Sequence, residues 1–153
     1  DGVVTAGNSS GINDGAASLV LANEDVAKQA KPLARIVAYG HAGLDPAIMG
    51  MGPVTASQQA LNRAGLQAHE LDVIESNEAF AAQACAVSQQ LDLDPLKVNP
   101  NGGAIALGHP VGATGAIIMT KLIHELRRTQ GRYGLATMCI GGGQGVAVVI
   151  EAL

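Results

Sequence analysis

The chain has 153 residues, of which 48% are hydrophobic and only 14% are charged, and its formal net charge is −4. This composition is typical of a buried α/β domain or of a subunit with large interfaces, and it excludes a disordered chain. No basic stripe interleaved with aromatic residues occurs, so nucleic acid is not expected as a partner, and no apolar stretch has the length of a membrane span.

The first part of the chain reads as loop with little regular structure. Residues 1–17 are rich in glycine and small polar residues, which favours a loop, and the apolar run 16–22 predicts a short buried strand. Asn23 is a candidate cap for a short helix to about residue 30, because Pro32 prevents its continuation.

The rest of the chain alternates between strand and helix patterns. Strands are predicted at 33–39, 71–75, 97–99, 135–140 and 146–153, and helices at 55–64, 78–91 and 113–128. This order, βαβαβαββ, predicts an α/β fold with a mixed five-stranded sheet and helices on its faces.

Three segments with chemically useful residues each follow a predicted strand: 75–80, 101–110 and 139–145. Ligands of such sheets bind outside the carboxyl ends of the strands, so these segments form the candidate site. Residues 141–145 lead into another strand rather than a helix, which argues against a dinucleotide loop, and no Gly-Lys-Ser/Thr sequence of a P-loop occurs.

His109 lies between Gly108 and Pro110, in a rigid turn. It is either a turn histidine that satisfies backbone groups, or a base or oxyanion donor that works near neutral pH. Cys139 ends an apolar strand, as an ordinary buried cysteine does, but the glycines after it clear space around the thiol and expose N–H groups suited to an oxyanion.

Asn77 begins a predicted helix, so it is expected to cap that helix, and it can position a water as well. Cys85 lies mid-helix between alanines and is interpreted as a packing residue. The two cysteines form no disulfide framework or metal motif. We therefore expect no metal, and we expect a reducing, cytoplasmic setting. The start at Asp1, without a Met or signal-peptide character, predicts a processed or truncated chain.

Three stretches resemble the signatures of the thiolase family, and their match is close to its biosynthetic acetoacetyl-CoA type. They are the Asn-Glu-Ala-Phe-Ala stretch 77–87, the Gly-His-Pro stretch 101–110 and the Cys-x-Gly-Gly-Gly-x-Gly stretch 139–145. Residues 5–16 and 49–53 fit as well, so the resemblance covers essentially the whole chain.

By this resemblance, residues 1–10 are the tail of a CoA-binding loop region and 11–30 belong to the N-terminal thiolase domain. Residues 31–153 form the C-terminal domain. The nucleophilic cysteine of the family lies in an N-terminal half that this chain lacks, and Cys85 cannot replace it because it falls within a helix.

The resemblance also implies a role for each candidate residue. His109 would activate the nucleophilic cysteine, and Cys139 would exchange a proton with the acetyl α-carbon. Asn77 would hold a water that stabilises the enolate with His109, and the N–H of Gly141 would form half of an oxyanion hole. Substrate contacts would come from Ser10 at the pantetheine arm and from Met49 and Phe80 in the pocket.

The implied reaction is the reversible Claisen condensation of two acetyl-CoA to acetoacetyl-CoA and CoA, with no cofactor besides these thioesters. Implied partners are the missing N-terminal half and further copies in a homo-oligomer, a tetramer. The alternative is a catalytically silent fragment that serves assembly or interaction. A ketoacyl synthase is disfavoured, because those enzymes use His/His or His/Asn pairs where this chain has Cys139.

Overall fold

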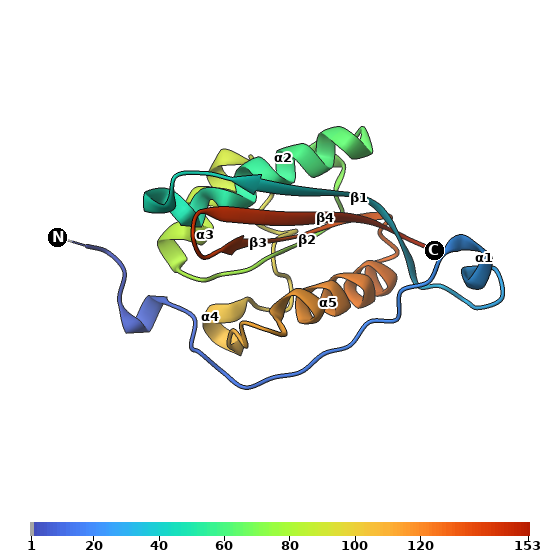
Figure 1. Cartoon of the computed structure of the whole chain (residues 1–153), viewed down its shortest axis with the longest axis horizontal. Helices are drawn as coiled ribbons and strands as arrows, with labels where there is room; N and C mark the ends of the chain where they lie inside the picture. Colours follow the sequence, from blue (N-terminus) through green and yellow to red (C-terminus); the bar gives the residue numbers. More distant parts are fainter. Residues whose placement is uncertain (1) are drawn as a thin grey trace.

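The computed structural model describes residues 2–153 and places strands and helices in nearly the predicted order (Figure 1). The strands are β1 (Ala34–Gly43), β2 (Val73–Ser76), β3 (Tyr133–Ile140) and β4 (Gln144–Ala152). The α-helices are α1 (Glu24–Ala27), α2 (Gly52–Ala64), α3 (Ala81–Gln90), α4 (Ala104–Leu107) and α5 (Thr114–Thr129). Short 3₁₀ helices occur at Ala6–Asn8, Pro46–Met51 and Ala68–Glu70.

The strands form one mixed sheet in the order β1-β4-β3-β2, in which β2 and β3 run parallel and the other neighbours run antiparallel. Helices cover both faces, with α2 and α3 on one side and α5 on the other (Figure 1). The α/β class with a mixed sheet is therefore as predicted, since each face must be covered to bury its apolar side chains.

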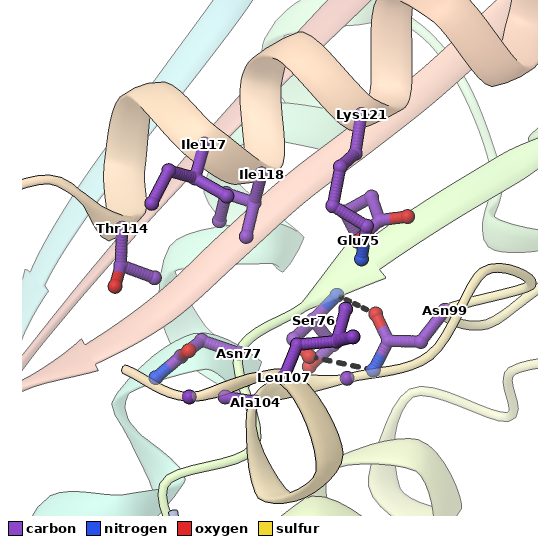
Figure 2. A pocket seen from close by; sticks show the side chains of 12 residues that line it. Glu75, Ser76, Asn77, Asn99, Ala104, Leu107, Thr114, Ile117, Ile118 and Lys121 are labelled. Atoms are coloured by element: carbon purple, nitrogen blue, oxygen red, sulfur yellow. Dashed lines mark hydrogen bonds and ion pairs between the residues drawn. The ribbon is translucent and has the colours of Figure 1, made fainter. Parts of the chain in front are cut away.

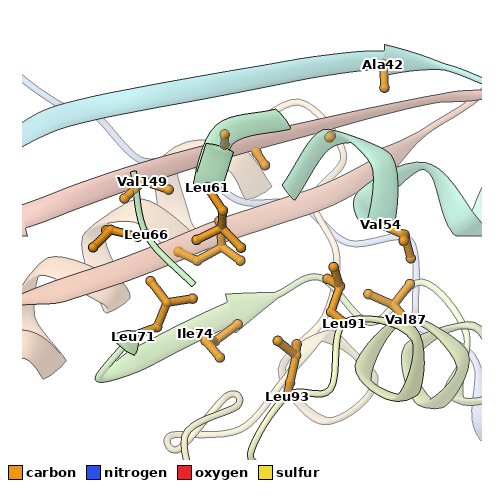
Figure 3. Close-up of a cluster of buried hydrophobic side chains, with 14 residues drawn as sticks. Ala42, Val54, Leu61, Leu66, Leu71, Ile74, Val87, Leu91, Leu93 and Val149 are labelled. Carbon is orange, nitrogen blue, oxygen red and sulfur yellow. The ribbon is translucent and has the colours of Figure 1, made fainter. Parts of the chain in front are cut away.

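The larger core lies between the sheet and the helices α2 and α3 (Figure 3). It is aliphatic, as the shortage of aromatic residues requires, and its fully buried members include Leu71, Ile74, Leu135 and Val149. A smaller core under α5 contains Leu122 and Leu126 at helical spacing, together with Val73, Ala136 and Ile150 of the sheet.

The prediction of a fifth strand at 97–99 was wrong, because only one isolated bridge joins Val98 to Ile74. Asn99 has a left-handed backbone, with φ of 47°, which ends the extended conformation. Its side chain then takes the place of further ladder pairing: Oδ1 accepts from the Ser76 N–H at 2.9 Å, and Nδ2 donates to the Ser76 carbonyl at 2.8 Å.

The predicted strand at 16–22 is also absent, and these residues are exposed and unpaired among residues 2–153. Val20 is 99% exposed, so burial, which favours an apolar strand, does not act on this segment. The helix that follows is a single turn, α1, which Asn23 caps as predicted by accepting from the Val26 N–H at 3.0 Å.

Helix α3 begins at Ala81 with Phe80 as its N-terminal cap residue, so the prediction that Asn77 caps this helix was wrong. Asn77 instead continues the backbone pairing of β2, since its N–H donates to the Thr137 carbonyl at 2.9 Å. Helix α2 ends at Gly65 as predicted, in the left-handed conformation that glycine adopts at little cost.

Two glycines bring helix α2 into direct contact with the start of β4. A Cβ on Gly145 would lie 2.1 Å from the carbonyl of Gly52, and a Cβ on Gly52 would lie 2.2 Å from the carbonyl of Gln144. This contact between two backbones leaves no space for any side chain, and it fixes the hairpin that follows Cys139.

We expect Gly145→Ala to lower the free energy of unfolding by about 1–3 kcal/mol or more, because the rigid Gly52 backbone cannot yield to the added methyl group. Urea denaturation of both proteins measures the difference. Gly112→Ala is the matched control, since no atom lies within 4 Å of the added Cβ there, and it should change stability by less than about 0.5 kcal/mol. Equal effects of the two substitutions would contradict this account of the contact.

Glu125 of α5 is a buried carboxylate that accepts three hydrogen bonds. It accepts from Arg128 Nε at 2.8 Å and Nη2 at 2.6 Å, and from Asn101 Nδ2 at 2.9 Å. The hydrogen bond from Arg128 and then that from Asn101 lower the pKa of Glu125 from 4.5 to about 2. Because Asn101 lies in the loop between α3 and α4, this carboxylate connects that loop to helix α5.

We expect Glu125→Gln to cost about 1–3 kcal/mol of stability at pH 7, since it removes charge-assisted hydrogen bonds. The pKa of the native carboxyl is lowered, so its contribution is complete above pH 4.5 and is lost as the pH falls toward 2. The difference between the two proteins should shrink over that interval in denaturation curves. Glu24→Gln, at an exposed carboxylate, is the control and should have little effect at any pH. A difference that is constant with pH would contradict the assignment.

Candidate functional site

The carboxyl ends of β2 and β3 meet at one edge of the sheet, because these two strands run parallel. Asn77 directly follows β2, and Cys139 is the penultimate residue of β3. The backbone bond from Asn77 to Thr137 places Asn77 beside the strand residue two positions before Cys139. The sequence-predicted Asn77 and Cys139 therefore lie at the same edge, as expected for a shared site.

The loop that carries His109 is attached to this edge at its beginning and in its middle. Asn99 pairs with the backbone of Ser76, as described above. The Glu78 carboxylate then accepts from Asn99 Nδ2 at 3.3 Å and from the Ile105 N–H at 3.2 Å. These bonds from residues next to Asn77 bring the loop back across the end of β2.

Asn77 and His109 are brought into direct contact. Asn77 Nδ2 lies 3.4 Å from His109 Nε2, and His109 Nδ1 lies 2.7 Å from Thr114 Oγ1. The Thr114 hydroxyl donates to the carbonyl of Pro110 at 3.0 Å, so its oxygen accepts from the histidine ring. These donor directions assign the proton of neutral His109 to Nδ1 and leave the lone pair of Nε2 facing Asn77.

Burial lowers the pKa of His109 below its ordinary value of 6.5. The half-buried ring is therefore neutral near pH 7, and its basic atom is Nε2. A histidine that only satisfied backbone groups of its turn would bond backbone atoms, whereas both ring nitrogens of His109 contact side chains.

Cys139 is 8% exposed, and burial raises the pKa of its thiol. The loss of solvent is the larger cause of this shift, and a backbone hydrogen bond at Cys139 opposes it only in part. No hydrogen bond among residues 2–153 joins Cys139 to His109 or Asn77. The structure thus places the three residues at one edge and joins two of them directly.

The turn after Cys139 holds the predicted oxyanion glycine in the open. Gly141 is exposed, and no atom lies within 4 Å of the position that a Cβ would take. Gly142 and Gly143 both have φ of 87°, which glycine adopts without strain. Gly143 also lies against the backbone of Leu44 and Pro46, where a Cβ would clash, so the shape of this turn depends on glycine.

The N-terminal segment packs on the same edge. Ser10 donates its N–H to the carbonyl of Ala79 at 3.0 Å, and Ser9 forms a bridge with Phe80. The His109 N–H donates to the carbonyl of Gly11 at 3.1 Å. Two of the predicted substrate residues, Ser10 and Phe80, therefore lie beside the site.

Met49, the third predicted substrate residue, is half-buried in the 3₁₀ helix Pro46–Met51. This helix packs on α3, since a Cβ on Gly50 would lie 2.6 Å from Gln83 Cγ. No described hydrogen bond or bridge joins Met49 to His109 or to Cys139, so its place in the site stays a prediction.

Several polar residues of the site were not found from the sequence: Thr114, Asn99, Glu78, Glu75 and Lys121 (Figure 2 shows four of them). Thr114 had one usable signal, because a hydroxyl at the start of a helix soon after a Gly-His-Pro turn can reach back to the histidine. Glu75 and Glu78 lie in the segment 75–80 that the sequence marks, but no role was assigned to them. Asn99 and Lys121 carry no local signal, since their partners are distant in the sequence.

In residues 2–153 no helix is long and apolar enough to cross a membrane. No group of three or more His, Cys, Asp or Glu side chains in the described part of the chain is arranged to hold a metal ion.

Solved structures of an acetyl-CoA acetyltransferase and of a 3-ketoacyl-CoA thiolase have the same fold as this chain. The chain matches the crystal structure of the Bacillus anthracis acetyl-CoA acetyltransferase with a TM-score of 0.96 and 55% identity, over 98% of this chain and 39% of that one. It matches human mitochondrial 3-ketoacyl-CoA thiolase with a TM-score of 0.92 and 52% identity, over 99% of this chain and 39% of that one.

Curated relatives agree with the structural matches. The chain is 63% identical to the beta-ketothiolase BktB of Cupriavidus necator over 155 aligned residues, which cover 100% of this chain and 39% of the relative. It is 60% identical to the acetyl-CoA acetyltransferase of Escherichia coli, over 99% of this chain and 39% of that protein. The chain thus spans about two fifths of the length of the relatives it matches.

The family model described as the C-terminal domain of thiolase matches residues 30–152, which is most of the chain. That span contains Asn77, His109, Cys139 and Gly141, the four residues predicted to take part in catalysis. The chain therefore belongs to the thiolase family.

Proposed function

We propose that this chain supplies the C-terminal part of the active site of an acetyl-CoA C-acetyltransferase. The reaction is the reversible Claisen condensation of two acetyl-CoA to acetoacetyl-CoA and CoA. The observation that supports it best is the hydrogen-bonded series Asn77–His109–Thr114 at the sheet edge that also carries Cys139. This edge therefore carries a neutral imidazole base and a buried thiol. An acyl transfer followed by a proton transfer at carbon requires both groups.

His109 is the proposed base for a nucleophilic cysteine outside this chain. Its Nε2 lone pair takes the thiol proton, and the thiolate attacks the thioester carbonyl and releases CoA. The Nδ1–H bond to Thr114 holds the ring in the tautomer that this step needs. Because burial lowers the pKa of His109, the ring is available in its neutral form at neutral pH.

Cys139 is the proposed acid and base for the acetyl α-carbon. The raised pKa of its thiol keeps the proton on sulfur at rest, which suits proton donation to the enolate in the thiolysis direction. Condensation is the reverse step: Cys139 first gives its proton to the departing CoA thiolate, and the thiolate that remains takes the α-proton. Asn77, through a water, would stabilise the enolate oxygen, and so would His109 through the Nε2–H that it gains from the nucleophilic thiol. The Gly141 N–H would stabilise the oxyanion of the acyl-enzyme.

The remaining proposals concern substrate, partners and compartment. Ser10 would contact the pantetheine arm, and Met49 and Phe80 would line the acyl pocket, with coenzyme A thioesters as substrates and no further cofactor. The partners would be an N-terminal thiolase half that carries residues 11–30 in its sheet, and further copies in a tetramer. Two free thiols suit a reducing, cytoplasmic compartment.

A silent assembly domain is the second candidate, and one observation favours it. The described residues offer no nucleophile beside His109, because Cys85 is exposed in the middle of α3 and Cys139 does not contact the ring. The two candidates differ in what happens when an N-terminal thiolase half is present.

We expect the isolated chain to thiolyse acetoacetyl-CoA far more slowly than about 1 per second, a typical enzyme rate. A chimera in which this chain replaces the matching segment of the Escherichia coli acetyl-CoA acetyltransferase should regain that rate, and thiolysis is followed by the loss of acetoacetyl-CoA. A folded but inactive chimera would favour the assembly role, and turnover by the isolated chain would show that it contains its own nucleophile.

In the active chimera we expect Cys139→Ser to slow condensation by about 10²–10⁴-fold, since a serine hydroxyl is a far weaker acid than a thiol. Acyl-enzyme formation should persist, because His109 is unchanged. The two steps are separated by mass spectrometry of the acyl-enzyme and by α-proton exchange of acetyl-CoA in heavy water. Cys85→Ser is the control and should leave both unchanged. Exchange at the parental rate in Cys139→Ser would make Cys139 structural.

Acyl-enzyme formation in the chimera should rise with pH through a midpoint below 6.5 and then stay constant through neutral pH. The sign follows from His109, whose protonated form at low pH cannot accept the thiol proton, and whose pKa burial lowers. Single-turnover rates between pH 5 and 8 measure the midpoint. A midpoint that does not respond to His109→Asn would assign the acid limb to another group.

A further inference from the structure

A buried ion pair lies behind the site, between β2 and α5. Glu75 is 1% exposed, and its Oε2 accepts from Lys121 Nζ at 2.8 Å. Lys121 also donates to the carbonyl of Gly102 at 2.6 Å. The second carboxylate oxygen, Glu75 Oε1, has no hydrogen-bond partner among residues 2–153.

Asn77 has the same deficiency. It is 2% exposed, its Nδ2 faces His109, and its Oδ1 has no partner among the residues described. A buried acceptor without a donor costs about 1–3 kcal/mol, so two of them close together call for a common donor.

A small cavity of about 30 Å³ is lined by both residues (Figure 2). Its other walls include Ala104, Thr114 and Ile118, and Lys121 closes it toward α5. One water needs about 10–15 Å³ of such volume and several polar partners, so the space suits one or two waters. A purely apolar cavity would stay dry, but three residues that line this one have a buried polar atom without a partner in the described part of the chain: Glu75, Asn77 and, through its hydroxyl, Ser76.

We propose that this cavity is a built water site, in which one or two waters donate to Glu75 Oε1 and Asn77 Oδ1, and that Glu75 thereby positions the amide of Asn77. Burial raises the pKa of Glu75 and its bond to Lys121 opposes this, so in the ion-paired form both free atoms are acceptors. Water is the neutral ligand that can supply two donors from one small molecule. The Lys121 ammonium in the wall disfavours a cation in the same space.

The water site completes the hydrogen bonds of the Asn77 amide in the orientation that the series from His109 to Thr114 requires. With Oδ1 bound to water, Nδ2 must face His109, whose Nε2 then accepts and whose Nδ1–H donates to Thr114. A flipped amide would present its oxygen to Nε2 and would favour the other tautomer of the ring. This positioning role rests on the proposed function of His109, whereas the water site does not.

The test uses the whole 153-residue chain in solution. Water-to-protein cross-relaxation in NMR should show long-lived water beside the Asn77 side-chain amide and the Ala104 methyl group. The nitrogen shifts of His109 should report the single Nδ1–H tautomer. A high-resolution crystal structure should show density at the same place, which keeps the test independent of any variant. Absence of both signals in the unsubstituted chain would overturn the proposal.

Ala104→Val fills the cavity without removing a polar group, and Ala106→Val is the matched control, since it makes the same change at an exposed residue of helix α4 that does not line the cavity. We expect Ala104→Val to lose the water signals and to give a mixture of His109 tautomers, while Ala106→Val keeps both. Loss of water with an unchanged tautomer would overturn the positioning role. An inactive chimera would overturn the proposed function and leave the water site standing.

Discussion

The pairing of one asparagine side chain with one backbone determines how this site is assembled. Asn99 bonds both the N–H and the carbonyl of Ser76, so it ends a strand after a single bridge and still satisfies the backbone of its neighbour. The chain is then free to turn away from the sheet and return over the end of β2. The loop that follows brings His109 to the end of β2, where its ring contacts Asn77.

The hairpin between β3 and β4, which follows Cys139, depends on glycines that carry no side chain. Gly52 and Gly145 let helix α2 contact β4 backbone to backbone, and Gly143 lies against Leu44 in the same way. Gly145 is also the ladder partner of Cys139. The hairpin therefore gains its rigidity from close backbone packing. The contacts of Gly143 and Gly145 hold the turn in which Gly141 presents its N–H.

Local sequence was sufficient where the determinant is local. The glycine at position 65 ended its helix as predicted, and the motif around His109 identified the family. Local sequence failed where residues distant in the chain decide the structure. The predicted cap of α3 was Asn77, but Phe80 occupies the cap position, because the Asn77 backbone bonds to Thr137 of β3 instead. The Asn99 side-chain pairing and the partners of Glu75 likewise depend on residues that only the fold brings near.

Burial acts on the two titratable groups of the site in opposite directions, and the result is a site that is neutral at rest. It lowers the pKa of His109 and raises that of Cys139, since in each case the charged form loses solvent. The directed series from Asn77 to Pro110 leaves Nε2 as the one basic lone pair of the ring. A thiol brought to this edge by another segment would thus meet a histidine prepared to accept a proton. The thiol of Cys139 would still hold its proton and be able to donate it. Charge appears in such a site only when substrate creates it, which is when fixed N–H donors stabilise it most.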